Sequence, residues 1–493
     1  MFSVNFDPSM FLAILPEICI LLLAILIFGL DLLLPKDQSN HLGWITAFGM
    51  VLIMVICLLV AQPGPENRLV WGGMLRQDWL GFGFKMMFLF AAAITALLVM
   101  NIDKLGKRGE FYLLLLASTL GMNLMVSAAD LIMLYLAIET TSIPLYVLAG
   151  FLKKDDKSTE AGFKYMLFGA MTSAVMLYGF SLIYGFSGTT NIYELANSFS
   201  SGQVNVPLIV GSLLLVLVGF SFKISAVPFH FWAPDVYEGA PTPIAGFLST
   251  ASKAAGFAVL LRFLLTAFPF LSGSWFIIMA VLSTITMTLG NLLALTQKNI
   301  KRMLAYSSIA HAGYILIGVA SAGAVLGSRS GLGVSSSIFY LIVYIVTNLA
   351  AFGAVTVFGR ATGSDEIATY AGLSRRSPGL ALIMMVALLS LAGMPPFGGF
   401  VVKFSVFAAA VQANMVWLAV VGVLNSIVGL YYYLTVLKVI YLYRSEDENK
   451  PIPLKGAYSF VLVVLTIGII LLGTVIAPWF GISNLTAAAI VIH

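Results

Sequence analysis

Residues 219–243 read GFSFKISAVPFHFWAPDVYEGAPTP, an apolar stretch that contains a lysine and several helix breakers. Lys223 lies among apolar side chains, and Pro228, His230 and Pro234 follow it closely. Proline removes a backbone donor and kinks or breaks a helix, and a charged side chain inside a bilayer is costly. The stretch therefore predicts a membrane helix that is interrupted beside a buried charge.

The composition places the chain in a membrane. Its 493 residues are 60% hydrophobic and only 10% charged, with a mean hydropathy of +1.00, whereas soluble proteins have about 25% charged residues. The apolar segment near the start is too long for a secretory signal, so we interpret it as the first membrane span. Cys19 and Cys57 stand in apolar segments without a CxxC pattern, which favours small buried side chains over a disulfide or metal site.

We expect an all-α polytopic membrane protein, because a spanning helix needs about 20 mostly apolar residues and many such runs follow one another. About fourteen spans are predicted, near residues 10–34, 43–62, 79–100, 110–127, 130–150, 160–186, 206–230, 243–266, 273–295, 301–322, 335–358, 379–411, 414–442 and 457–480.

The lysines and arginines fix the orientation. With fourteen spans both termini share one side, where the loops carry only Arg68, Arg76 and Arg329. The opposite loops carry Lys36, Lys104, Lys107, Arg108, Lys153, Lys154, Lys157, Lys298, Lys301, Arg302, Arg360, Arg375, Arg376, Arg444, Lys450 and Lys455. The positive-inside rule then predicts both termini outside the cytoplasm. The net charge of +5 is explained by this topology, without a nucleic-acid partner.

Seven basic residues remain inside the spans. Arg262 and Lys438 stand near span ends, and Lys85 is early in its span, so we expect these three to extend towards the interface. The other four, on separate spans, are Lys164, Lys223, Lys253 and Lys403. Intramembrane ionisable residues usually mark ion or proton pathways. The competing interpretation is that the lysines only join helices through backbone carbonyls.

Three further ionisable residues fit a proton pathway. Glu139, in LYLAIETTSIPLY, is the one carboxylate well inside a later span, and a buried carboxylate needs a cation if it is to stay ionised. His230 and His311, the latter in YSSIAHAGY, also lie at span positions, and histidine transfers protons near neutral pH. Which groups touch one another does not follow from the sequence.

Two spans carry internal breakers. Pro228 interrupts the seventh, and LAGMPPFGGFVVKFSVF interrupts the twelfth just before Lys403. Discontinuous helices in corresponding positions of two halves are typical of inverted repeats around an ion site. We therefore predict two inverted five-helix repeats, spans 4–8 and 9–13. The expected segments are 1–105 (three helices), 106–270 (first repeat), 271–445 (second repeat) and 446–493 (last helix).

The absence of several motifs limits the chemistry of the chain. It has no GxGxxG after a strand, no P-loop, no CxxCH, no nucleophile elbow and no His/Cys/Asp/Glu cluster with metal-ligand spacing. We expect no redox cofactor, nucleotide or metal to be bound by this chain.

The same residues carry a family resemblance that extends over nearly the whole chain. The strings KISAVPFHFWAPDVYEGAPTP, ASKAAGFAVLLR, TQKNIKRMLAYSSIAHAGY, LSLAGMPPFGGFVVKF and GLYYYL resemble the subunit N family of the proton-pumping NADH:quinone oxidoreductase, respiratory complex I. The resemblance implies an antiporter-like fold. It also implies that Glu139 and Lys223 form a coupled pair, that Lys253 and Lys403 continue a proton relay, and that Lys164 and His311 belong to an axial hydrated path.

This resemblance implies a proton-translocating subunit of a multisubunit, multi-pass inner-membrane enzyme. Flavin, iron–sulfur clusters and quinone are expected in partner subunits, and the expected partners are other complex I membrane subunits, including sister antiporter-like ones. Both termini are expected on the periplasmic side. The alternative is a component of a secondary Na⁺(K⁺)/H⁺ antiporter, which would use the same buried lysines.

Overall fold

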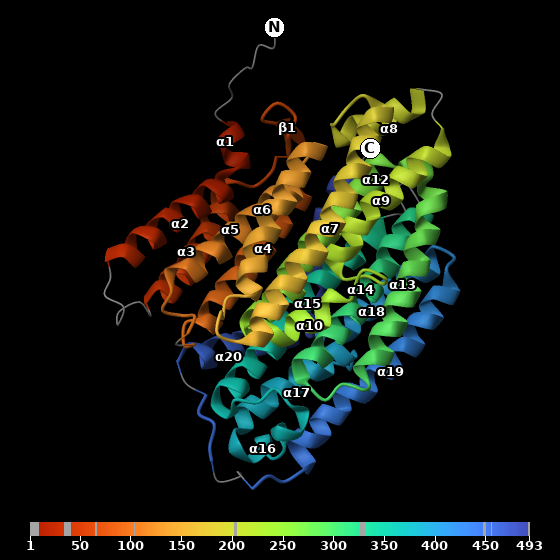
Figure 1. Ribbon diagram of the computed structural model, residues 1–493. Coiled ribbons are helices and arrows are strands. Elements are labelled where there is room, and N and C mark those ends of the chain that lie inside the picture. The colour runs from red at the N-terminus through yellow and green to blue at the C-terminus, as the bar shows by residue number, and fades with distance from the viewer. Residues whose placement is uncertain are drawn as a thin grey trace.

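The computed structural model describes residues 9–33, 41–64, 67–102, 104–201, 205–325, 331–446, 450–454 and 456–491. Lys36, Arg329 and Lys455, counted above as loop cations, lie outside these ranges. The described chain is a bundle of long helices (Figure 1). The one sheet within these ranges is an antiparallel hairpin of β1 (Arg68–Val70) and β2 (Leu75–Gln77).

Thirteen helical segments of the described chain are long and apolar enough to cross a membrane. They are α2 (Leu15–Leu33), α3 (His41–Val60), α4 (Trp79–Val99), α5 (Gly109–Ser127), α6 (Leu131–Ala149), α7 (Asp156–Ser187), α9 (Val206–Ile224), the joined α11 (Thr242–Phe247), η1 (Leu248–Ser252) and α12 (Lys253–Ala267), the joined η2 (Pro269–Leu271) and α13 (Ser272–Ala294), α14 (Ile300–Ala324), α15 (Gly331–Thr362), α19 (Val416–Leu442) and α20 (Ala457–Thr474).

The remaining predicted span is the broken one, made of α17 (Pro378–Ala392) and α18 (Gly398–Gln412). Each half is too short to cross alone, so the pair completes the predicted set of about fourteen. The shorter elements are α1 (Ser9–Ala13), α8 (Ile192–Ser201), α10 (Trp232–Gly239), η3 (Ile367–Tyr370), α16 (Leu373–Arg376) and α21 (Ile476–Val491).

The last span differs from the prediction of 457–480. Helix α20 ends at Thr474, and a separate helix α21 follows it. Pro478 lies at the start of α21 and has no backbone N–H to donate to the Thr474 carbonyl four residues earlier, which weakens the helix at the point where α20 ends. Thr486 of α21 faces Gly83 in the first turns of α4. The C-terminal helix therefore ends at the same end of the molecule as β1 and α1 (Figure 1).

Both predicted interruptions are present. Helix α9 ends at Ile224, Ser225 adopts a left-handed conformation (φ 59°, ψ 39°), and α10 begins at Trp232. In the other half, α17 ends at Ala392, Gly393 is left-handed (φ 88°, ψ 39°), and α18 begins at Gly398. The two inverted repeats and the four segment limits stay predictions.

The centre of the bundle is formed by α12, α14 and α15, which are almost wholly buried. The closest neighbour of α14 is α13, and glycines allow the approach: a Cβ on Gly290 would lie 2.6 Å from the Ala310 nitrogen, and one on Gly313 would lie 2.5 Å from the Met287 nitrogen. Small residues of this kind bring membrane helices into backbone contact. This packing holds the 307–311 stretch of α14 in the bundle interior.

The predicted interfacial extension of Arg262 and Lys85 is wrong. Arg262 is 3% exposed and donates to both carboxylate oxygens of Asp78, at 2.6 and 2.9 Å. Lys85 is 5% exposed and lies 2.8 Å from Glu17. The acidic partners come from segments distant in the sequence, so only the tertiary fold brings them to the basic residues.

Candidate functional site

The predicted pair Glu139 and Lys223 is not in direct contact, but Lys223 binds a hydroxyl on the helix that carries Glu139. The Lys223 ammonium, 5% exposed in the last turn of α9, donates to the Ser142 hydroxyl of α6 at 2.9 Å. Ser142 lies one turn after Glu139, whose carboxylate accepts a hydrogen bond from Ser173 of α7. Between these two described residues there is no ion pair within 4.0 Å. Glu139 is also only half-buried, so the carboxylate is a near neighbour of Lys223 and not its direct partner.

Lys253 has backbone and hydroxyl partners. It is 1% exposed and directly follows a π-helical turn, Leu248–Ser252, which is common where helices carry functional groups. Its ammonium donates to the Ser308 carbonyl of α14 at 3.0 Å and also to the Ser308 hydroxyl. Among the described residues it forms no ion pair. A buried ammonium held by dipoles alone is easier to neutralise than one held by a carboxylate.

His311 lies one turn after Ser308 on α14 and joins two tyrosines. Its Nδ1 is 2.7 Å from the Tyr340 hydroxyl of α15, and its Nε2 is 3.3 Å from the Tyr433 hydroxyl of α19. The Tyr433 hydroxyl also shares a hydrogen bond with Ser307. Imidazole and hydroxyl groups both donate and accept hydrogen bonds, so this cluster can pass a proton in either direction.

Lys403 binds to the break in its own span. Its ammonium, in α18, donates to the Ala392 carbonyl at 2.9 Å, where α17 ends. It also lies 4.9 Å from the centre of the Tyr314 ring of α14. A helix C-terminus carries partial negative charge, and an aromatic face attracts a cation. Lys403 and Ser426 are the polar side chains in the lining of a mostly apolar cavity of about 310 Å³ between the broken span and α19.

Lys253, the His311 cluster and Lys403 therefore lie in order across the bundle centre, but the direct contacts have two gaps. One lies between Ser308, which binds Lys253, and Ser307, which binds Tyr433. The other lies between the His311 ring and Lys403, where the Tyr314 ring stands 5.8 Å from His311. A proton that crossed these gaps would need a side-chain rotation or a water molecule.

His230 lies apart from this line. It is 4% exposed between α9 and α10, and its ring lies against the Phe231 ring, with centroids 4.4 Å apart and the planes tilted by 34°. Its Nδ1 has no hydrogen-bond partner among the described residues. The sequence-based role of His230 as a secondary relay group stays a prediction.

Lys164 belongs to a charge cluster beside α10. Its ammonium is 2.5 Å from Asp235 and 2.6 Å from Glu160, and its side chain is 33% exposed. Arg302 of α14 lies 2.7 Å from Asp235 and 2.9 Å from Glu238. Burial raises the pKa of Asp235, but hydrogen bonds from Lys164 and Arg302 outweigh it and hold that pKa below its usual range. Lys164 is thus ion-paired to α10 and makes none of the contacts described for Lys253 and Lys403.

Sequence reasoning missed the hydroxyl groups that connect these cations. Ser142, Ser308, Tyr340 and Tyr433 stand in apolar helices where serine and tyrosine are common, so each one alone carries little signal. The available signal was spacing: in YSSIAHAGY, Ser307, Ser308 and His311 fall on one face of a helix.

Among the described residues no group of three His, Cys, Asp or Glu side chains has a metal-binding arrangement.

Residues 128–429, which include all seven predicted site residues, match the family model described as the NADH:quinone oxidoreductase/Mrp antiporter transmembrane family. NADH-quinone oxidoreductase subunit N of Moorella thermoacetica is 43% identical over 464 residues, 94% of this chain and 95% of that protein. The chain therefore belongs to this transmembrane family and, within it, to the subunit N group of NADH-quinone oxidoreductases.

Solved structures agree with this assignment. A chain of respiratory complex I from Thermus thermophilus has a TM-score of 0.78 and 32% identity, covering 94% of this chain and 98% of that one. A chain of the Mrp complex from Dietzia has a TM-score of 0.80 at 21% identity, covering 99% and 98%. The second likeness concerns the fold alone.

Proposed function

We propose that the chain is a proton-translocating membrane subunit of a complex I-type NADH:quinone oxidoreductase. The observation that carries this is the order of buried groups, Lys253, His311 and Lys403, in a chain 43% identical to a subunit N. None of the three has a carboxylate partner among the described residues. Each is held instead by carbonyl, hydroxyl or aromatic groups, an environment in which a cation can form and be lost as the surroundings change.

In this mechanism proton transfer starts in the half of the chain that contains Glu139 and Lys223. Redox chemistry in partner subunits changes the electrostatic interaction between Glu139 and Lys223, whose ammonium is held by Ser142 on the Glu139 helix. A change in the charge or distance of Glu139 alters how well the buried Lys223 holds its proton. The proton then passes to Lys253, through the His311 cluster to Lys403, and out. Lys164 and His230 are secondary groups in this scheme.

The proposed partners and location of this chain are based on its relatives. Flavin, iron–sulfur clusters and quinone belong to partner subunits, and this chain contributes no redox centre. Its partners are other complex I membrane subunits, including sister antiporter-like ones, and the complex lies in the bacterial inner membrane with the termini of this chain on the periplasmic side. The unequal distribution of lysines and arginines between the loops supports this orientation.

The test is NADH-driven proton uptake by the purified complex in proteoliposomes. Lys223→Ala should lower proton uptake per NADH oxidised, because the first relay group is lost. The matched control is Lys438→Ala, a lysine near the end of α19 that lies 5.6 Å from the Tyr443 ring and outside the relay. Unchanged uptake in Lys223→Ala, with the complex fully assembled, overturns the role given to Lys223.

The second candidate is a component of a secondary Na⁺(K⁺)/H⁺ antiporter, favoured by the fold shared with the Mrp complex and by a family model whose description also names the Mrp antiporter. Two measurements separate the candidates. Co-purification with flavin and iron–sulfur subunits supports the first. Complementation of sodium-sensitive growth by this chain together with antiporter subunits supports the second.

A further inference from the structure

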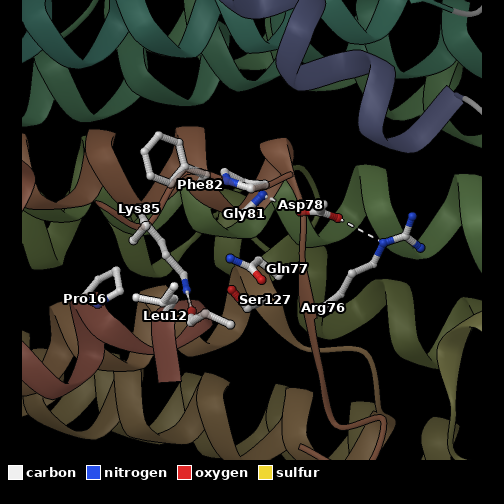
Figure 2. Close-up of a pocket in the computed structure, with 12 residues that line it drawn as sticks. Leu12, Pro16, Arg76, Gln77, Asp78, Gly81, Phe82, Lys85 and Ser127 are labelled. Atoms are coloured by element: carbon white, nitrogen blue, oxygen red, sulfur yellow. Dashed lines mark hydrogen bonds and ion pairs between the residues drawn. The ribbon is translucent and has the colours of Figure 1, made fainter. Parts of the chain in front are cut away.

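A second group of buried charges lies at the end of the molecule that carries α1, the β1–β2 hairpin and the end of α21. We call Arg76, Asp78 and Arg262 the terminal-end charge cluster. They are 6%, 1% and 3% exposed. Figure 2 shows Arg76 and Asp78 pointing towards each other at the edge of a small cavity, which Lys85 and Ser127 also line. None of these residues belongs to the proposed relay.

The cluster is held together by many direct contacts. Both oxygens of Asp78 accept from Arg262, one of them also accepts from the Gly81 N–H at 2.8 Å, and Arg76 Nε is 3.3 Å from the other. Arg262 further donates to the Tyr193 hydroxyl, and the Arg76 guanidinium lies 4.2 Å from the centre of the Tyr193 ring. One carboxylate is thus shared by two guanidinium groups.

A polar stripe leads from the interior of the membrane region to this cluster. Thr119, Asn123 and Ser127 follow one another at intervals of four on α5, and all are at most 3% exposed. Among the described residues neither side-chain atom of Asn123 has a hydrogen-bond partner. A buried amide of this kind is satisfied most simply by water. The stripe ends at Ser127 beside the cavity and Asp78.

The cluster is also aligned with the relay. Lys253 begins α12 and Arg262 stands nine residues later on the same helix, about 13 Å further along its axis. A protonated group at Lys253 is therefore separated from the terminal end by little more than two helical turns and this group of charges. A path that leaked at this point would let protons return and cancel the work of the pump.

The chemistry of the cluster opposes proton passage. A guanidinium does not release its proton under biological conditions, so neither arginine can act as a carrier. The adjoining cavity is only about 20 Å³, space for about one water molecule. The cluster, together with Lys85 and its partner Glu17, holds three bases and two acids, a net positive charge that repels hydronium. Fixed arginines exclude protons from membrane pores in the same way.

We propose that Arg76, Asp78 and Arg262 form an electrostatic barrier to protons at the end of the molecule that carries α1 and the β1–β2 hairpin. The barrier prevents protons from leaking back from this end to Lys253. This proposal rests on the proposed function in one respect, because a barrier is needed only where a proton path exists. Its test needs no NADH, so it can succeed or fail independently of the relay.

The experiment is passive proton influx into proteoliposomes that contain the intact complex, driven by a potassium diffusion potential and followed with an enclosed pH-sensitive dye. Arg262→Gln removes one fixed charge and leaves Asp78 with Arg76 as its cationic partner, so Asp78 binds a proton more readily. Influx per assembled complex should rise on the order of tenfold, because an unscreened charge acts strongly at low dielectric. Arg262→Lys keeps the charge and should stay within about twofold of wild type.

A purely structural role for the cluster gives a different result. It lowers the amount of assembled complex but leaves the influx per assembled complex unchanged, and that outcome overturns the barrier. Arg76→Gln keeps the Arg262–Asp78 pair intact, so it provides a second measurement if Arg262→Gln does not assemble. Its influx should also rise, by about twofold or more, and an unchanged value again overturns the proposal. Lys438→Gln, outside the cluster, is the control and should not change influx.

Discussion

The two broken spans each hold a buried lysine beside the break, but the lysines have different partners. Lys223 stands before its break, in the last turn of α9, and reaches a hydroxyl one turn away from Glu139. Lys403 stands after its break, in α18, and returns to the Ala392 carbonyl at the end of α17. In the first half a carboxylate from another helix influences the lysine. In the second half the helix end created by the break holds the lysine directly.

This difference indicates a division of roles. A lysine near a half-buried carboxylate responds to anything that moves or neutralises that carboxylate, which suits the input side of a relay. A lysine held by a backbone carbonyl and an aromatic ring has a fixed electrostatic environment. Its proton affinity then depends mainly on the charges that arrive from Lys253.

The largest expected effect comes from Lys403→Arg. Arginine keeps the positive charge, the carbonyl contact and the attraction to Tyr314, but it does not deprotonate. If Lys403 carries protons, the loss should match that of Lys403→Ala, since removing an acid–base group slows proton transfer by about 10²-fold or more. NADH-driven proton uptake in proteoliposomes measures this. Full uptake in the arginine variant would show that Lys403 only joins helices.

Substitutions at the two left-handed residues should give the next largest contrast. A Cβ on Gly393 would lie 2.9 Å from Lys403 Cδ, and the left-handed backbone costs a non-glycine residue about 1–2 kcal/mol. Gly393→Ala should therefore lower both the thermal stability of the complex and its proton uptake. Ser225→Gly relieves the corresponding strain in the first half and should leave both unchanged or slightly improved. Equal effects of the two substitutions would contradict the difference between the two breaks.

Ser142→Ala tests the connection in the first half. It removes the hydroxyl between Lys223 and the Glu139 helix, and a hydrogen bond to a charged group contributes about 1.5–3 kcal/mol. Proton uptake should fall by about tenfold, and Glu139→Gln should add little to it in the double variant because both act on Lys223. Ser405→Ala, which removes a hydroxyl bonded to its own helix at Val401, is the control. Fully additive effects would contradict a shared pathway through Ser142.

Much of the fold was predictable because lipid imposes simple rules. The spans, the all-helical class and both breaks follow from hydropathy and from proline and glycine at membrane depth. The end of α20 was missed because the apolar pattern continues through Pro478, and hydropathy does not register a missing N–H.

The site was predictable only in its ionisable residues. Lys223, Lys253, Lys403 and His311 are conspicuous in apolar helices, but their partners are hydroxyls and carbonyls, which every sequence contains in abundance. The pairing of Arg262 with Asp78 is the clearest failure, because an arginine near a span end and an aspartate in a loop are ordinary when considered separately. Only tertiary packing brings together residues 184 positions apart.

The smallest expected effect on proton uptake concerns the Tyr314 ring, whose face lies 4.9 Å from the Lys403 ammonium. Tyr314→Phe keeps the aromatic face and loses a hydroxyl that accepts from Asn291 at 3.0 Å, while Asn291 keeps the Asn425 carbonyl at 3.1 Å as a second acceptor. Tyr314→Leu loses the ring, and with it a cation–π attraction of about 0.5–2 kcal/mol. Proton uptake should stay close to wild type for phenylalanine and fall about threefold for leucine. A larger loss for phenylalanine than for leucine would mean that the hydroxyl, and not the ring, serves Lys403, and the second half would then depend on a hydroxyl as the first half does.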